Sequence, residues 1–150
     1  MTKEELNHIL TRMLQEGDKA KEEGEVPVSA ALVLPNQKVI YTRNRVEENN
    51  DPFAHAEILS LQKGFQVTGS RYLKDGILIV SLEPCLMCMG AILKAGIKTL
   101  IYVLPDPKLG SLSYYHVFLE NKCEVVEIED SRFQSQLDSF FLTLRTKEGK

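Results

Sequence analysis

The sequence has only three cysteines, no long apolar run and no excess of positive charge. A small, odd number of cysteines does not build a disulfide framework, so we expect a cytoplasmic protein with reduced thiols. The apolar runs, such as residues 77–80, are far shorter than the roughly 20 residues that span a bilayer, and the first residues lack the basic-then-apolar pattern of a secretory signal. Neither a membrane protein nor a secreted one is therefore expected.

The net charge is −3, from 18 basic and 21 acidic residues, so a general electrostatic grip on nucleic acid is excluded and any such binding must come from a local patch. No repeat, low-complexity tract or linker divides the 150 residues. The apolar fraction of 43% and the charged fraction of 26% are typical of a globular protein. We therefore expect residues 1–150 to form a single domain.

Strands and helices are predicted to alternate after an initial hairpin. The expected strands are residues 28–34, 38–42, 77–82, 97–104 and 125–128. The expected helices are residues 2–23, a helix that starts at Asp51-Pro52 and ends near Gly64, residues 84–96 and residues 133–144, and the expected loops are residues 44–50 and 105–110. This order indicates an α/β protein with three layers, in which helices cover a sheet of five strands.

Two short segments carry the chemistry, Ala54-His55-Ala56-Glu57 and Glu83-Pro84-Cys85-Leu86-Met87-Cys88. Cysteines three apart at the start of a helix can direct both sulfurs to one point, and the helix N-terminus favours the thiolates that a metal needs. His55 is the best nitrogen donor available. Two thiolates and one imidazole suit Zn²⁺, and a site with only three protein ligands keeps a place for water, as catalytic zinc sites do.

Glu57 is the candidate proton-transfer group for such an open site. Residues two apart on a helix point about 200° apart, so His55 and Glu57 reach one site only where the end of the helix faces it. There Glu57 could take a proton from water and deliver it to a leaving group. Taken alone, Cys-x-x-Cys could equally be a redox pair or a structural zinc site, and His-x-Glu could be a chance surface pair. The two segments together favour catalytic zinc.

The remaining cysteine and histidines are weaker candidates for a functional role. Cys123 lies in an apolar pattern and is interpreted as a small buried side chain. His8 is expected on the surface of the first helix, and His116 is expected to be at the surface or partly packed.

The two segments resemble the zinc-dependent nucleobase deaminases, whose signature is His-x-Glu followed by Pro-Cys-x-x-Cys. Further stretches are similar to the bacterial tRNA wobble-adenosine deaminases: Glu25-Val26-Pro27-Val28, Asn44-Arg45, residues 51–58, residues 82–88 and Phe140-Phe141. The resemblance covers about residues 5–145. It implies the three-layer α/β/α cytidine deaminase-like fold with a five-stranded mixed sheet, and deamination of adenosine to inosine at the wobble position of a tRNA.

The resemblance also implies roles for single residues. One zinc ion per subunit would be held by His55, Cys85 and Cys88, and Glu57 would transfer the proton. Asn44 would hydrogen-bond the purine and Val28 would pack on its face, while the backbone at Ala56 and Pro84 would fix the water and the product. The anticodon loop would be contacted by Asp106, Lys108, Phe140 and Phe141. The family is similar in being dimeric.

The sequence departs from the family pattern in four places that concern binding of the anticodon loop. Ser29 stands where the family has glycine, the loop after Asp106 is about three residues short, the C-terminal segment is less basic than usual, and residues 120–130 are acidic. Two alternatives therefore stay open. One is a deaminase of a free base or nucleoside such as guanine or cytosine, and the other is a zinc-binding partner subunit without activity, which the presence of Glu57 argues against.

Overall fold

The computed structural model describes residues 1–112 and 122–147 of the chain. A five-stranded sheet forms its centre, with strand order β2-β1-β3-β4-β5. The strands are β1 (Ser29–Val33), β2 (Val39–Arg43), β3 (Ile77–Leu82), β4 (Thr99–Leu104) and β5 (Glu124–Glu127). Strand β1 is antiparallel to β2 and β3, whereas β3, β4 and β5 run parallel, so the sheet is mixed as expected.

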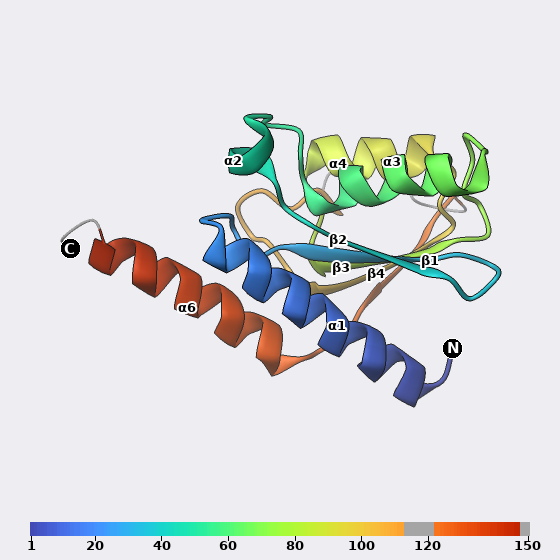
Figure 1. The fold of residues 1–150 in the computed structure, drawn as a ribbon. Helices are drawn as coiled ribbons and strands as arrows, with labels where there is room; N and C mark the ends of the chain where they lie inside the picture. The colour runs from blue at the N-terminus through green and yellow to red at the C-terminus, as the bar shows by residue number, and fades with distance from the viewer. Residues whose placement is uncertain (113–121, 148–150) are drawn as a thin grey trace.

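Helices cover both faces of this sheet (Figure 1). The helices are α1 (Lys3–Glu22), α2 (Val46–Asn49), α3 (Ala56–Thr68), α4 (Leu86–Lys94) and α6 (Ser131–Lys147). Helices α3 and α4 enclose one core cluster with the sheet, centred on Leu32, Leu78 and Met89. Helices α1 and α6 lie side by side on the opposite face over Met13, Ile79 and Phe133. The predicted three-layer α/β/α architecture is confirmed.

Four expectations about the helices are wrong. Residues 44–50 contain the short helix α2, because the carboxylate of Glu25 accepts hydrogen bonds from the amides of Glu47 and Glu48 at its start. Helix α3 does not start at Asp51-Pro52: the Asp51 side chain accepts the amide of Phe53 in a turn, and His55 is the N-cap.

Helix α3 also continues past Gly64 to Thr68 and is capped by Gly69, whose φ of 70° is left-handed. A Cβ at Gly64 would lie 2.6 Å from Leu32 Cδ2, so this glycine serves close packing of α3 on β1 and not helix termination. Pro84 likewise does not begin α4, since Cys85 is the N-cap.

The third cysteine and two of the histidines lie outside the predicted site segments of the sequence. Cys123 is 8% exposed and joins the core on the α3 and α4 side, and His8 is exposed, both as predicted. His116 lies outside the described residues. Within the described ranges, no helix combines the length and the apolar character needed to cross a membrane.

Candidate active site

The starts of two helices meet at one place beside the end of strand β3. His55 is the N-cap of α3, and Cys85 is the N-cap of α4, three residues after β3 ends at Leu82. A helix N-terminus carries partial positive charge and unpaired amide groups. Both helix ends therefore favour negative charge at the point that they share. Because the end of α3 faces this point, His55 and Glu57 can reach one site, as their spacing in the sequence requires.

The three predicted ligands lie together there. Nδ1 of His55 is 3.8 Å from Sγ of Cys85 and 3.4 Å from Sγ of Cys88. One ligand atom from each residue lies within 4.8 Å of the others, and among the described residues this is the one group of His, Cys, Asp and Glu with such spacing. Cys88 is fully buried, whereas His55 and Cys85 are partly exposed, so the group opens toward solvent on one side.

The two sulfurs compete for one negative charge. Hydrogen bonds from Cys88 and then His55 lower the pKa of Cys85 to about 4, so this sulfur is a thiolate at neutral pH. The pKa of Cys88 is raised, first by its hydrogen bond to Cys85 and then by burial. The hydrogen bond to Cys85 also raises the pKa of His55. A divalent cation between the sulfurs would remove this competition and stabilise both thiolates.

Glu57 lies in the first turn of α3 and is only 3% exposed. Its Oε1 atom is buried and has no hydrogen-bond partner among the described residues. Burial raises the pKa of this carboxyl group. A buried carboxylate with a free oxygen beside a metal-binding cluster is placed to accept a proton from water or substrate.

A cavity of about 270 Å³ connects these groups. The structure brings six of the predicted site residues to this one pocket: Val28, Asn44, His55, Glu57, Cys85 and Asp106. The Asn44 side chain is 9% exposed, and its Oδ1 accepts the amide of Ala56 over 2.9 Å. This bond ties the end of β2 to the start of α3 and leaves the side-chain NH₂ of Asn44 without a partner among the described residues.

The backbone groups assigned to substrate at Ala56 and Pro84 already have partners. The Ala56 amide donates to Asn44, and the Pro84 carbonyl accepts from the amide and the hydroxyl of Ser111, over 3.0 and 2.6 Å. The roles predicted for these groups stay predictions, and substrate would have to displace or share these bonds.

The residues predicted to contact the anticodon loop lie in two separate places. Asp106 lines the pocket, and its Oδ1 accepts the amides of Lys108 and Leu109, which shapes the loop there. Phe140 and Phe141 lie on α6 and do not line the pocket; their rings meet edge to face at 5.3 Å. Phe140 is 9% exposed and Phe141 is 40% exposed, so Phe141 is the one available to a partner.

Eight further residues line the pocket without a role predicted from the sequence, among them Glu25, Glu83 and Leu109. The two glutamates stand inside the motifs that carried the resemblance, which was the available signal. Leu109 is 71% exposed at the rim, and nothing in its sequence context marks it.

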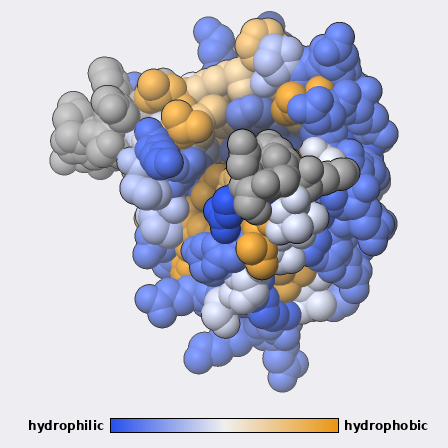
Figure 2. All heavy atoms as spheres, turned by 90° about the vertical axis from the view of Figure 1, so that its left-hand side faces the viewer, coloured by the Kyte–Doolittle hydropathy of each residue, from blue (hydrophilic) through white to orange (hydrophobic). Residues whose placement is uncertain are grey.

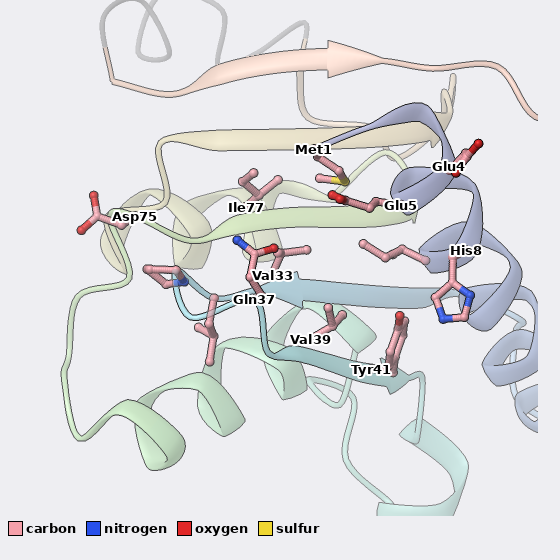
Figure 3. A pocket seen from close by; sticks show the side chains of 13 residues that line it. Met1, Glu4, Glu5, His8, Val33, Gln37, Val39, Tyr41, Asp75 and Ile77 are labelled. Atoms are coloured by element: carbon pink, nitrogen blue, oxygen red, sulfur yellow. The ribbon is translucent and has the colours of Figure 1, made fainter.

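A second and larger cavity, of about 700 Å³, lies between α1, the β1–β2 hairpin and the start of β3 (Figure 3). Val33, Val39 and Ile77 form its apolar floor, while His8 and the carboxylates of Glu4, Glu5 and Asp75 lie around it. Its described lining contains no cysteine and no close group of metal-ligating atoms. This cavity therefore lacks the chemistry of the smaller one.

Comparison with known proteins agrees with this site. The family model for the cytidine and deoxycytidylate deaminase zinc-binding region matches residues 3–104. The chain belongs to this deaminase family. A tRNA-specific adenosine deaminase from Aquifex aeolicus is 34% identical over 145 residues, which cover 92% of this chain and 95% of the relative.

Two solved structures show the deaminase fold from different branches. One comes from studies of A-to-I editing by tRNA:A34 deaminases at the wobble position; it has a TM-score of 0.76 and 33% identity and covers 89% of this chain and 99% of its own. The other, a guanine deaminase from Bacillus subtilis, has a TM-score of 0.62 and 34% identity and covers 70% of this chain and 66% of its own.

Zinc is the cofactor of this deaminase family, and the residues present fit it. The two sulfurs that compete for one charge and the Oε1 of Glu57, which has no partner among the described residues, would both be stabilised by a nearby divalent cation. One imidazole and two thiolates form the donor set of catalytic zinc sites, which keep one position open.

Proposed function

We propose that this protein is a hydrolase that converts adenosine to inosine at the wobble position of a tRNA, using zinc held by His55, Cys85 and Cys88. The observation that carries the proposal is the buried carboxyl group of Glu57, whose Oε1 has no hydrogen-bond partner among the described residues and which lines the same pocket as His55 and Cys85. The likeness to tRNA-specific adenosine deaminases supports the choice of substrate. We place the reaction in the cytoplasm and treat residues 1–150 as a single deaminase domain.

Glu57 is the catalytic residue of this proposal. A zinc ion bound in the site would lower the pKa of a water molecule and so make a nucleophile available at neutral pH. Glu57 takes one proton from that water and gives it to the purine ring nitrogen next to carbon 6, as the water oxygen bonds to this carbon. It then carries the second proton to the departing amine, the bond from carbon 6 to nitrogen breaks, and ammonia and inosine result.

The base is held by groups already in place around the pocket. The free NH₂ group of Asn44 donates a hydrogen bond to the purine, and Val28, which is 7% exposed, packs against its face. A base inside an RNA loop must leave its stack to reach this pocket, which costs least where it is unpaired. The wobble position in an anticodon loop meets this condition.

The contact with RNA must be made locally because the net charge is −3. The surface beside α2 and the end of α6 is mostly hydrophilic, with scattered hydrophobic groups (Figure 2). Lys108, near the pocket, and Phe141, Leu142 and Arg145 on α6 are exposed and could contact the backbone and bases of the loop.

We further propose that two copies of the chain pair through α3 and α4. A groove of about 420 Å³ there is lined mainly by apolar groups, including Ile58, Leu61, Phe65, Tyr72 and Ala91. Tyr72 is 61% exposed, and burial of such a face favours association. Analytical ultracentrifugation is expected to give a dimer, and a monomer at micromolar concentration would contradict the pairing.

Deamination of a free base is the second candidate, favoured by the small volume of the pocket and the acidic overall charge. Zinc-loaded protein should be incubated with transcribed arginine tRNA, and nucleosides should be measured by mass spectrometry after nuclease digestion. Inosine at the wobble position is expected with the wild type and not with Glu57→Gln. Ammonia from guanine or cytosine, with no inosine in tRNA, would select the second candidate. No product from any substrate would select a partner subunit without activity.

A further inference from the structure

Two glutamates that line the catalytic pocket have no part in the proposed chemistry. Glu25 belongs to the segment between α1 and β1, and Glu83 lies between β3 and α4. Within residues 1–112 and 122–147 neither carboxylate forms an ion pair. Each carboxylate instead accepts hydrogen bonds from two backbone amides.

Glu25 holds one wall of the pocket. It is 2% exposed, and its two carboxylate oxygens accept the amides of Glu47 and Glu48 over 3.0 and 2.9 Å. These amides begin α2, whose Val46 and Glu47 also line the pocket. One buried carboxylate thus fixes this segment against the chain that leads to Val28.

Glu83 holds a second segment of the pocket lining in the same manner. Its Oε1 accepts the amide of Asp106 over 3.0 Å, and its Oε2 accepts the amide of Leu112 over 3.1 Å. It therefore binds both ends of the 106–112 loop, which contributes Asp106 and Leu109 to the pocket. A Cβ at Gly110 would lie 2.2 Å from Oε2 of Glu83, so the loop wraps the carboxylate too closely for any side chain there.

We propose that Glu25 and Glu83 are positioning residues, a pair of carboxylate anchors that fix α2 and the 106–112 loop and so set the width of the pocket in which the target base must fit. The inference rests on the proposed function, since it assigns the two anchors to substrate binding by that site. Neither anchor touches the reacting atoms; both act through the pocket walls.

Carboxylates suit this task better than neutral side chains. Two oxygens can accept two amides at once, and charge strengthens both bonds. Glutamine has the same shape, but its NH₂ group would face a backbone N–H, and a donor that faces a donor leaves both unsatisfied. Glu25→Gln and Glu83→Gln therefore break one of the two bonds with no change in volume.

The test compares Glu25→Gln and Glu83→Gln with Glu22→Gln and Glu129→Gln, two exposed glutamates outside the pocket. Zinc content and rates of inosine formation are measured on an RNA stem-loop that carries the wobble adenosine. The anchor variants are expected to keep one zinc per chain and to lose at least tenfold in kcat/KM, mainly through a higher KM, and the controls to stay within twofold. An anchor variant within twofold of wild type would overturn the inference.

Hydrogen–deuterium exchange gives a readout that does not depend on turnover. Glu83→Gln should speed exchange at Asp106 and Leu112 but not at Glu47 and Glu48, and Glu25→Gln should do the reverse. Unchanged exchange at the two amides that a substituted glutamate binds in the wild type would overturn the inference. If wild type forms no inosine, the proposed function fails, while exchange still decides whether the carboxylates hold the walls.

Gly110→Ala covers the case in which Glu83→Gln does not fold or loses zinc. The added methyl group would lie 2.2 Å from Oε2 of Glu83 and 2.4 Å from the carbonyl oxygen of Asp106, so the loop and the carboxylate cannot keep their present contact although the carboxylate is retained. It is expected to raise KM as Glu83→Gln does, and a KM equal to that of wild type would contradict the role of the loop.

Discussion

The two cavities lie at opposite ends of strand β3 and differ in what lines them. The cavity beside Ile77, at the start of the strand, is the larger, at about 700 Å³, with an apolar floor and an acidic rim. The cavity beside Leu82, at the end of the strand, holds about 270 Å³, yet it contains two of the metal-binding side chains and the buried Glu57. Volume is thus a poor guide to function here.

The difference has a structural cause. Ligand sites in α/β proteins lie beyond the carboxyl ends of the parallel strands, where helices begin. At the end of β3 two helix N-termini meet and favour negatively charged ligands, whereas the large cavity is bordered by α1, a hairpin and the start of β3. Of these two cavities, only the smaller combines a thiolate with an imidazole and a carboxylate.

The sharpest way to test this contrast is to compare one substitution in each cavity. Glu57→Gln should reduce the rate of deamination by about 10²- to 10⁴-fold, since a proton-transfer group contributes on that order. His8→Ala, in the large cavity, should leave the rate within twofold. Both rates are measured with zinc-loaded protein; a large loss with His8→Ala and none with Glu57→Gln would reverse the assignment of the two cavities.

Loss of a metal ligand should affect stability as well as activity. Cys88 is buried on α4 and His55 caps α3, so a shared zinc joins the two helices. Where free zinc is about 1,000 times its Kd, removal of the metal costs about 4 kcal/mol of folding stability. Calorimetry should therefore show a large fall in Tm for chelated wild type and for Cys88→Ala, with no further fall when the variant is chelated. A variant that melts like zinc-loaded wild type would contradict the shared site.

The metal site could be predicted from the sequence because its ligands stand in local patterns. His55, Cys85 and Cys88 each lie within a turn of a helix start, so spacing alone gives their direction. The alternation of apolar residues similarly predicts the sheet and its layers. What spacing cannot give are boundaries set by distant contacts, such as α2, which depends on Glu25, and the continuation of α3 through Gly64, which depends on Leu32.

The anchor roles of Glu25 and Glu83 could not be predicted from the sequence for the same reason. Their partners are backbone amides more than 20 residues away along the chain, and an amide has no sequence signature. Asn44 shows the same limit, since its bond to Ala56 joins segments that only the folded sheet brings together.

The buried carboxylate predicts a pH effect on metal-free protein. Burial raises the pKa of Glu57 above its ordinary value of 4.5, so the folded protein holds this proton more tightly than the unfolded chain. The stability that it gains in this way is complete below the unfolded pKa and is lost as pH rises through the folded pKa.

Metal-free Glu57→Gln, which cannot ionise, should therefore melt at a higher temperature than metal-free wild type at pH 8, and the two should converge near pH 4. Thermal melts across this range in the presence of a chelator measure the difference. Equal Tm values at pH 8 would contradict a desolvated carboxylate.

The smallest effect concerns the position where the family has glycine. Ser29 is fully buried, and its Oγ has no partner among the described residues, although its amide donates to Oγ of Ser81 over 3.0 Å. Ser29→Ala removes an unsatisfied hydroxyl and should raise the free energy of unfolding by about 1 kcal/mol. Ser81→Ala, which removes the acceptor of the Ser29 amide, should lower it by a similar amount. A loss of stability with Ser29→Ala in urea unfolding would contradict the absence of a partner.

X-ray absorption at the zinc edge of the wild-type protein tests the central claim most directly. If His55, Cys85 and Cys88 hold a zinc ion with one position open beside Glu57, the spectrum will fit two sulfur ligands at about 2.3 Å and two nitrogen or oxygen ligands at about 2.0 Å, one of them from water. Substitution of Glu57 by glutamine should leave both sulfur distances unchanged. A protein without bound zinc, or a zinc with three or four sulfur ligands, would contradict the account.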